Sequence, residues 1–160
     1  MEKTVDFAAV GRVARHTELK DIRIVEMLAK CGPKLTGALH PSIDLHCSIA
    51  SKDEKMLEVA CDCSFSAHCG ETLAAQVQIQ YLLTYKLSTS EHLNDDDLSQ
   101  FASANGALHS WPFLRETLYG MISRMGYPPF TLPVMHFHPK PPAETKPEEE
   151  EVVLGDEPQE

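Results

Sequence analysis

The feature that most constrains the fold is a long stretch of strict apolar–polar alternation over residues 72–88. Every odd position in this stretch is apolar, while the even positions are mostly polar. Successive side chains of a β-strand point to opposite faces, so this alternation predicts a strand with one buried face and one face in water. The apolar positions are Leu73, Ala75, Val77, Ile79, Tyr81, Leu83, Tyr85 and Leu87.

Two earlier runs have the same period of two. They lie at residues 42–50 and 56–66, where apolar and polar side chains again alternate. The connections at residues 52–54 and 68–71 are short and polar. Because short polar connections join neighbouring strands, the three runs are predicted to pair consecutively as an antiparallel meander.

The first forty residues give a weaker pattern. Apolar spacing over residues 3–16 fits a short helix, and the branched side chains of residues 19–28 predict a fourth strand. Residues 29–41 contain two glycines and two prolines, which predicts a loop between this strand and the meander.

A helical period follows the strands. Asn94 and the three aspartates after it form a helix start, since a capping side chain and acids in the first turn are favoured there. Pro112 sits where a second helix can begin, and the period continues to Met125, before Gly126. The sequence therefore predicts a broken or double helix that covers one face of an antiparallel sheet, an α+β fold. Residues 130–137 are predicted to be extended.

Length and charge bound the organisation of the chain. The 160 residues suit one domain, which we place at residues 1–137. Residues 138–160 are rich in proline and glutamate and are predicted to be a disordered acidic tail. The net charge is −10, of which −6 falls in the tail. Nucleic acid is therefore not an expected partner, because phosphate contacts need clustered lysine and arginine.

The cellular compartment follows from what the chain lacks and from its cysteines. No apolar run is long enough to cross a bilayer, and the acidic N-terminus does not resemble a secretory signal. Direct membrane insertion is therefore not expected. The five cysteines form an odd number and are interpreted as reduced thiols of a cytoplasmic protein.

Several clusters could suggest chemistry. Cys61, Cys63, His68 and Cys69 could bind zinc, but Cys61 and Cys63 fall in phase with the apolar face of their strand, which favours core packing. Three aspartates at residues 95–97 could hold a divalent cation, but helix capping explains them. His136 and His138 are interpreted as surface histidines. No nucleophile elbow or phosphate loop is recognised, so no catalytic residue, metal or cofactor is predicted.

Eight apolar residues lie in or beside the first predicted loop and the segment after the predicted helix. Some must complete the core. Others could line an apolar groove for an extended polypeptide, in which methionine would adapt to varied sequences. The sequence leaves these alternatives open for Leu28, Leu35, Leu39, Phe130, Leu132, Val134, Met135 and Phe137.

Three motifs resemble the SecB family of chaperones. They are the helix start at residues 111–116 (Trp-Pro-Phe-Leu-Arg-Glu), the stretch at 126–132 (Gly-Tyr-Pro-Pro-Phe-Thr-Leu), and the segment at 133–137 (Pro-Val-Met-His-Phe). The order of four alternating strands before the helix also matches, so the resemblance covers roughly residues 16–137.

The resemblance implies a four-stranded antiparallel sheet, a long helix in the C-terminal half, and a homotetramer that is a dimer of dimers. It also implies ATP-independent holding of unfolded polypeptides in hydrophobic grooves near the first crossover loop and the post-helix segment. These places contain the eight apolar residues above, which are the predicted client-binding residues. The helix would contribute to assembly through Trp111, Phe113, Leu114, Leu118 and Met121.

The sequence departs from the export chaperones at two places. Prolines 139, 141 and 142 block the second helix that follows in that family. Gln76 stands where an acidic residue is expected to dock the SecA motor, although Asp21 can be matched to another such acid. The first departure implies that a wall of the groove is missing or supplied differently, and the second argues against the usual delivery to SecA. Residues 19–26 resemble instead SecB-like chaperones of toxin–antitoxin modules, which implies an antitoxin as a client.

Two other classes of function stay open. A hot-dog thioesterase or small-ligand binder also wraps a sheet around a long helix, with Glu116 as the one obvious catalytic carboxylate. In that fold, however, the main helix precedes most strands. The second alternative is an interaction module that binds one folded partner.

Overall fold

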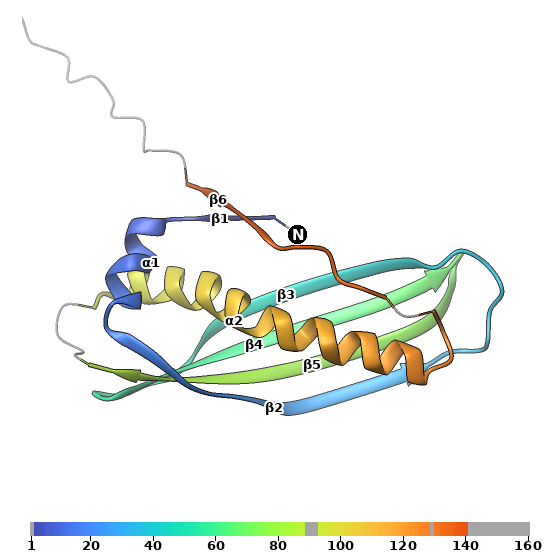
Figure 1. The fold of residues 1–160 in the computed structure, drawn as a ribbon, viewed down its shortest axis with the longest axis horizontal. Helices are drawn as coiled ribbons and strands as arrows, with labels where there is room; N and C mark the ends of the chain where they lie inside the picture. Colours follow the sequence, from blue (N-terminus) through green and yellow to red (C-terminus); the bar gives the residue numbers. More distant parts are fainter. Residues whose placement is uncertain (1, 89–92, 129, 141–160) are drawn as a thin grey trace, which may run out of the picture.

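A four-stranded antiparallel sheet forms one layer of the protein in the computed structural model, which describes residues 2–88, 93–128 and 130–140 (Figure 1). The strands are β2 (Thr17–Cys31), β3 (His40–Lys52), β4 (Met56–Cys69) and β5 (Thr72–Leu87), in the order β2-β5-β4-β3. The predicted meander of three strands is confirmed. The remaining strand, β2, pairs with β5 at the far side of the meander. The chain then crosses the sheet to β3 through residues 32–39, the crossover segment.

The alternation of the sequence sets the two faces of the sheet. The odd positions of β5 from Ala75 to Leu87 are at most 4% exposed, and they face the helix layer. The corresponding positions of β4, from Leu57 to Ala67, are equally buried. This apolar face therefore forms the floor of the core, as the period of two predicts.

One continuous helix, α2 (Asp95–Arg124), lies across that face (Figure 1). The Asn94 side chain accepts a hydrogen bond from the Asp97 backbone N–H at 2.8 Å, which confirms the predicted cap. The prediction of a break at Pro112 is wrong, since Pro112 lies inside the helix. Proline removes the bond to the carbonyl of Leu108, one turn earlier. Both residues are on the exposed side of α2, where water can bind that carbonyl.

The N-terminus adds two elements that pack beside α2. They are β1 (Glu2–Val5) and α1 (Phe7–Ala14), the latter within the region predicted to be a short helix. Arg12 of α1 donates two hydrogen bonds to the buried Asp97 carboxylate, at 2.7 and 2.6 Å. This ion pair lowers the pKa of Asp97 and joins α1 to the start of α2.

The chain after α2 returns along the helix and ends in β6 (His136–Pro139), which pairs in parallel with β1 (Figure 1). Neither strand is predicted by a sequence pattern, although residues 130–137 are predicted to be extended. The N–H of Lys140 donates to the Val5 carbonyl at 2.8 Å, so this pairing runs past the predicted domain end at residue 137. The rest of the predicted tail, residues 141–160, lies outside the described residues. In the part of the chain that is described, no helix is long and apolar enough to span a membrane.

Candidate functional site

An apolar pocket opens where the crossover segment meets the end of α2. Its volume is about 490 Å³. No charged side chain lines it, so it suits an apolar ligand. The lining residues are Leu35, Gly37, Leu39, Pro41, Phe65, Ala67, Ile122, Tyr127, Pro128 and Phe130.

The crossover segment is held at three points, which fixes one wall of the pocket. The Gly32 N–H donates to the Ala74 carbonyl at 2.8 Å, and the buried Tyr127 hydroxyl donates to the Pro33 carbonyl at 2.8 Å. At Gly37 the segment comes so close to the sheet that a Cβ would lie 2.8 Å from the Cys69 sulfur. A larger residue at this position would therefore push the wall outward.

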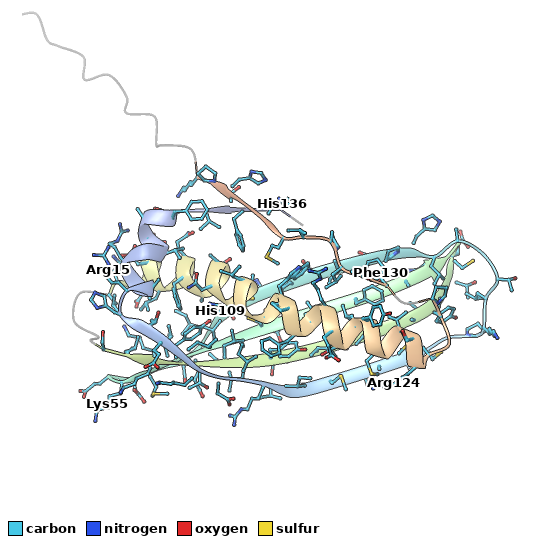
Figure 2. All side chains as sticks on the ribbon, in the orientation of Figure 1. Arg15, Lys55, His109, Arg124, Phe130 and His136 are labelled. Atoms are coloured by element: carbon cyan, nitrogen blue, oxygen red, sulfur yellow. The ribbon has the colours of Figure 1, made fainter. Side chains whose placement is uncertain are left out.

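The floor and the opposite wall come from the sheet and from the chain after α2. Phe65 projects from the buried face of β4, and its ring centroid lies 5.4 Å from that of Phe130. Figure 2 labels Phe130, on the chain that follows α2. Gly126, with a positive φ of 81°, lets the chain turn at the end of α2. This turn brings Tyr127 and Phe130 back over the sheet.

The structure brings some of the predicted client-binding residues together and separates others. Leu35, Leu39 and Phe130 line the same pocket. Leu132 is only 1% exposed and packs in the core, so its role in client binding stays a prediction. Val134, Met135 and Phe137 lie further along the returning chain, and Val134 is 63% exposed. Leu28 lies on the other face of the sheet, outside this pocket.

The predicted assembly residues of α2 also divide. Trp111, Leu114 and Leu118 are at most 6% exposed and pack inside the core of the single chain. Their role in assembly stays a prediction, for which the single chain leaves little of each side chain exposed. Phe113 is half-exposed and Met121 partly exposed, so both remain available.

The edge strand β2 carries apolar side chains that nothing in the described chain covers. Ile24 and Met27 face the helix layer, since they pair with the buried Tyr81 and Ile79 of β5. Each of the two is nevertheless more than 40% exposed. The cause is that α2 packs mainly against β3, β4 and β5.

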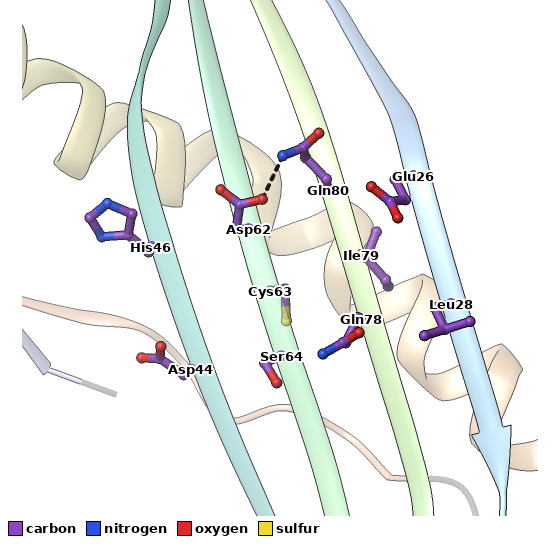
Figure 3. A pocket seen from close by; sticks show the side chains of 10 residues that line it. All are labelled: Glu26, Leu28, Asp44, His46, Asp62, Cys63, Ser64, Gln78, Ile79 and Gln80. Atoms are coloured by element: carbon purple, nitrogen blue, oxygen red, sulfur yellow. Dashed lines mark hydrogen bonds between the residues drawn. The ribbon is translucent and has the colours of Figure 1, made fainter.

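The outer face of the sheet holds a second, shallower depression of about 310 Å³ (Figure 3). It combines Leu28 with three carboxylates from three strands, Glu26, Asp44 and Asp62. The Gln80 amide donates to Asp62 at 2.7 Å across the strands (Figure 3). Sequence reasoning missed this site, because alternation shows which residues face water but not which of them gather in a hollow.

The residues considered as metal ligands lie in the core or on the surface. Cys61 and Cys63 lie in the core, as their alternation predicts. Burial raises the pKa of Cys63 to about 12, so its thiol stays protonated and is a poor ligand. His136 and His138 are exposed, as expected. Across residues 2–88, 93–128 and 130–140, no three His, Cys, Asp or Glu side chains converge on a metal position.

The strand order β2-β5-β4-β3, the crossover segment and the long helix across one face define a SecB-like α+β fold, so the predicted fold class is confirmed. Among solved structures, the chain is similar to the Mycobacterium tuberculosis Rv1957 SecB-like chaperone, determined in complex with a ChAD peptide from the Rv1956 HigA1 antitoxin. The TM-score is 0.72 at 19% sequence identity, over 79% of this chain and 96% of that chain.

Other comparisons add little. A protein of unknown function from Streptococcus agalactiae gives a TM-score of 0.47 at 9% identity, over 74% of this chain and 97% of that chain. This similarity bears on neither fold nor function. No protein-family profile and no curated protein sequence matches the chain.

Proposed function

We propose that the protein is a holding chaperone that binds unfolded or aggregation-prone polypeptides without ATP. The observation that carries the proposal is the uncharged pocket at the crossover segment, where Leu35, Leu39 and Phe130 meet in a SecB-like fold. The structurally similar Rv1957 chaperone is in complex with a peptide, which supports a polypeptide as the ligand.

Binding would be driven by burial of client side chains against the pocket. Each Å² of apolar surface removed from water contributes about 25 cal/mol, from which the cost of ordering the client is subtracted. The lining offers aromatic rings, aliphatic side chains and no fixed charge. Such a surface accepts many apolar sequences, and it cannot retain a client whose apolar side chains are buried by folding.

An antitoxin is the client class that we favour. The peptide bound to Rv1957 comes from an antitoxin, and residues 19–26 of this chain resemble the chaperones of toxin–antitoxin modules. Export preproteins and SecA remain the alternative. On the outer sheet face, where SecA would dock, Gln76 pairs with Lys30 of β2, so this position offers no carboxylate. Preferential binding of an antitoxin segment over SecA distinguishes the two roles.

We further propose a cytoplasmic homotetramer. The exposed edge and apolar side chains of β2, with Phe113 and Met121 of α2, would form the contacts between copies. Native mass spectrometry should then give four times the 17.8 kDa mass of the chain. The Ile24→Asp variant, which places a charge on the exposed edge strand, should give smaller species.

The pocket is tested by a matched pair of variants. Leu39→Glu places a charge in the pocket, whereas Phe7→Glu places the same charge on a 53% exposed residue of α1. We expect Leu39→Glu to abolish suppression of client aggregation, and Phe7→Glu to leave it intact. Normal holding by Leu39→Glu, with an unchanged oligomeric mass, would rule out the pocket as the client site.

The two other classes of function make different predictions. A thioesterase would need Glu116, which is exposed on α2 and does not line the pocket. Turnover of acyl thioesters that is lost in Glu116→Gln would favour the enzyme. A saturable complex with one folded protein, without suppression of unrelated aggregation, would favour the interaction module.

A further inference from the structure

The chain after α2 crosses the molecule as an extended strap, residues 130–139, which has the character of a client. Its apolar side chains include Phe130, Leu132, Met135 and Phe137, and its two ends are held in different ways. Figure 1 shows it running from the end of α2 back to β1. Its first residue, Phe130, lines the pocket, so the strap begins at the pocket wall.

The near half of the strap belongs to the core. Leu132 is 1% exposed, and the Phe130 ring packs on Phe65. The Trp111 indole N–H donates to the Pro133 carbonyl at 3.1 Å, which fixes the strap at its middle. Up to Pro133, then, the strap is held by the core, and Phe130 is part of the pocket wall.

The far half is held differently. Val134 is 63% exposed, and β6 pairs with β1 alone over four residues, within the described part of the chain. Parallel strands usually lie in larger, covered sheets, and an isolated two-stranded ribbon is only marginally stable. The far half can therefore leave while the strap up to Pro133 stays in place, at the cost of the contacts that Met135 and Phe137 make with the core.

The partner strand β1 is anchored independently of β6. Val5 is 3% exposed, and the Asp6 carboxylate caps α1 through the N–H groups of Ala8 and Ala9. The Arg12 guanidinium then ties α1 to α2. If the ribbon opened, β1 would stay in place and present an unpaired edge.

We propose that the far half of the strap, residues 134–139, is an internal stand-in for a client, which an extended client segment displaces. The incoming segment pairs with the edge of β1 and lays alternate apolar side chains where Met135 and Phe137 now pack. The partner class is thus an extended polypeptide long enough to fill both the pocket and the β1 edge. This inference rests on the proposed function and adds a second, strand-pairing part to its site.

An engineered disulfide tests the displacement. Thr4 and His138 are direct partners in the β1–β6 register. Adjacent strands lie about 4.8 Å apart, within the Cα range that a disulfide accepts. The Thr4→Cys/His138→Cys pair is placed in a parent that carries Cys31→Ser and Cys69→Ser, which removes the two cysteines that are not buried. Oxidised and reduced forms of one protein then differ only in whether the strap can leave.

The readout is the Kd for fluorescently labelled, reduced and carboxymethylated α-lactalbumin, which is permanently unfolded. We expect the oxidised form to bind about tenfold more weakly or worse, because the competent state is no longer populated, and the reductant to restore binding. Thermal unfolding curves should show that both forms are folded. Equal affinity of the two folded forms would overturn the displacement.

The pocket itself has a separate control. If the displacement is right, Leu39→Glu should weaken binding in both redox forms, since it acts at the other end of the site. If the parent does not bind the probe at all, the proposed function fails, and this inference falls with it. If the parent binds the probe, and the oxidised and reduced forms of the disulfide variant bind it equally, the strap displacement is wrong and the chaperone proposal still stands.

Discussion

Gly106 sets how closely α2 approaches the sheet. It is buried in the middle of the helix, above β3 and β4. A Cβ built on it would lie 3.0 Å from the Cβ of Cys47, the Sγ of Cys61 and a methyl carbon of Val59. Real Cβ contacts are rarely this short, and all three neighbours are core residues of the sheet. We therefore expect Gly106→Ala to strain the interface between the two layers.

The sign of the effect depends on two opposing magnitudes. Alanine is favoured over glycine inside a helix by about 1 kcal/mol. Inserting a methyl group into a packed core costs about 1–3 kcal/mol. Because three contacts must yield together, we take the upper half of that range and expect a net loss of about 1 kcal/mol in the free energy of unfolding.

Gly120 provides a matched control in the same helix. A Cβ there meets only the end of the Arg124 side chain, at 3.3 Å, which can move aside. Gly120→Ala should therefore keep the helix gain of about 1 kcal/mol. Urea unfolding at one fixed protein concentration should shift the midpoint down for Gly106→Ala and up for Gly120→Ala, with unchanged m-values. Equal stabilisation by both changes would refute the idea that glycine sets the distance between the layers.

Three further predictions concern other parts of the fold. The Nδ1 of His109 lies 3.0 Å from the Tyr85 hydroxyl, and burial lowers the pKa of this histidine from its ordinary value of 6.5. Below pH 6.5 the unfolded chain therefore binds more protons at His109 than the folded chain does. The stability from neutral His109 is full above that pH and falls below it; the difference in unfolding free energy between the protein and His109→Gln should shrink from about pH 7.5 to about pH 5. Arg12→Gln should speed hydrogen exchange in α1 while the sheet stays protected, because the ion pair joins α1 to α2; unchanged α1 exchange would contradict that role. A thiol reagent should label Cys31 and Cys69 in the folded protein, as counted by mass spectrometry; the cysteines that should react only after unfolding are Cys47, Cys61 and Cys63.

The sheet and its faces could be predicted because alternation is a local signal with a direct structural meaning. The continuity of α2 could not, since the cost of a proline depends on whether water can replace the lost hydrogen bond, and only the fold shows that Pro112 is exposed. The pairing of β1 with β6 joins four residues at each end of the domain, and so short a strand has no readable period. Long-range pairing of this kind depends on the packing of the whole chain.

The site was predicted only in part, for a related reason. An apolar period shows which residues share a face, but not what that face meets. Leu114 and Leu118 form such a stripe, which packs in the core of the single chain. Leu35 and Leu132 both come from irregular segments, yet Leu35 lines the pocket while Leu132 completes the core. That distinction depends on where α2 stops covering the sheet, which no local pattern records.

The width of the sheet explains why part of its apolar face stays exposed. Four strands about 4.8 Å apart are wider than one helix of about 10 Å diameter, so α2 cannot cover the whole apolar face. Towards β3 and β4, near the end of the helix, the crossover segment and the strap cover the remainder incompletely and leave the pocket. Towards β2, Ile24 and Met27 stay exposed. The two uncovered parts of the apolar face therefore have one cause, the width of the sheet relative to the helix. The first lies along a strand edge and the second in a pocket, which supports our proposals of a second copy of the chain at the first and of a client at the second.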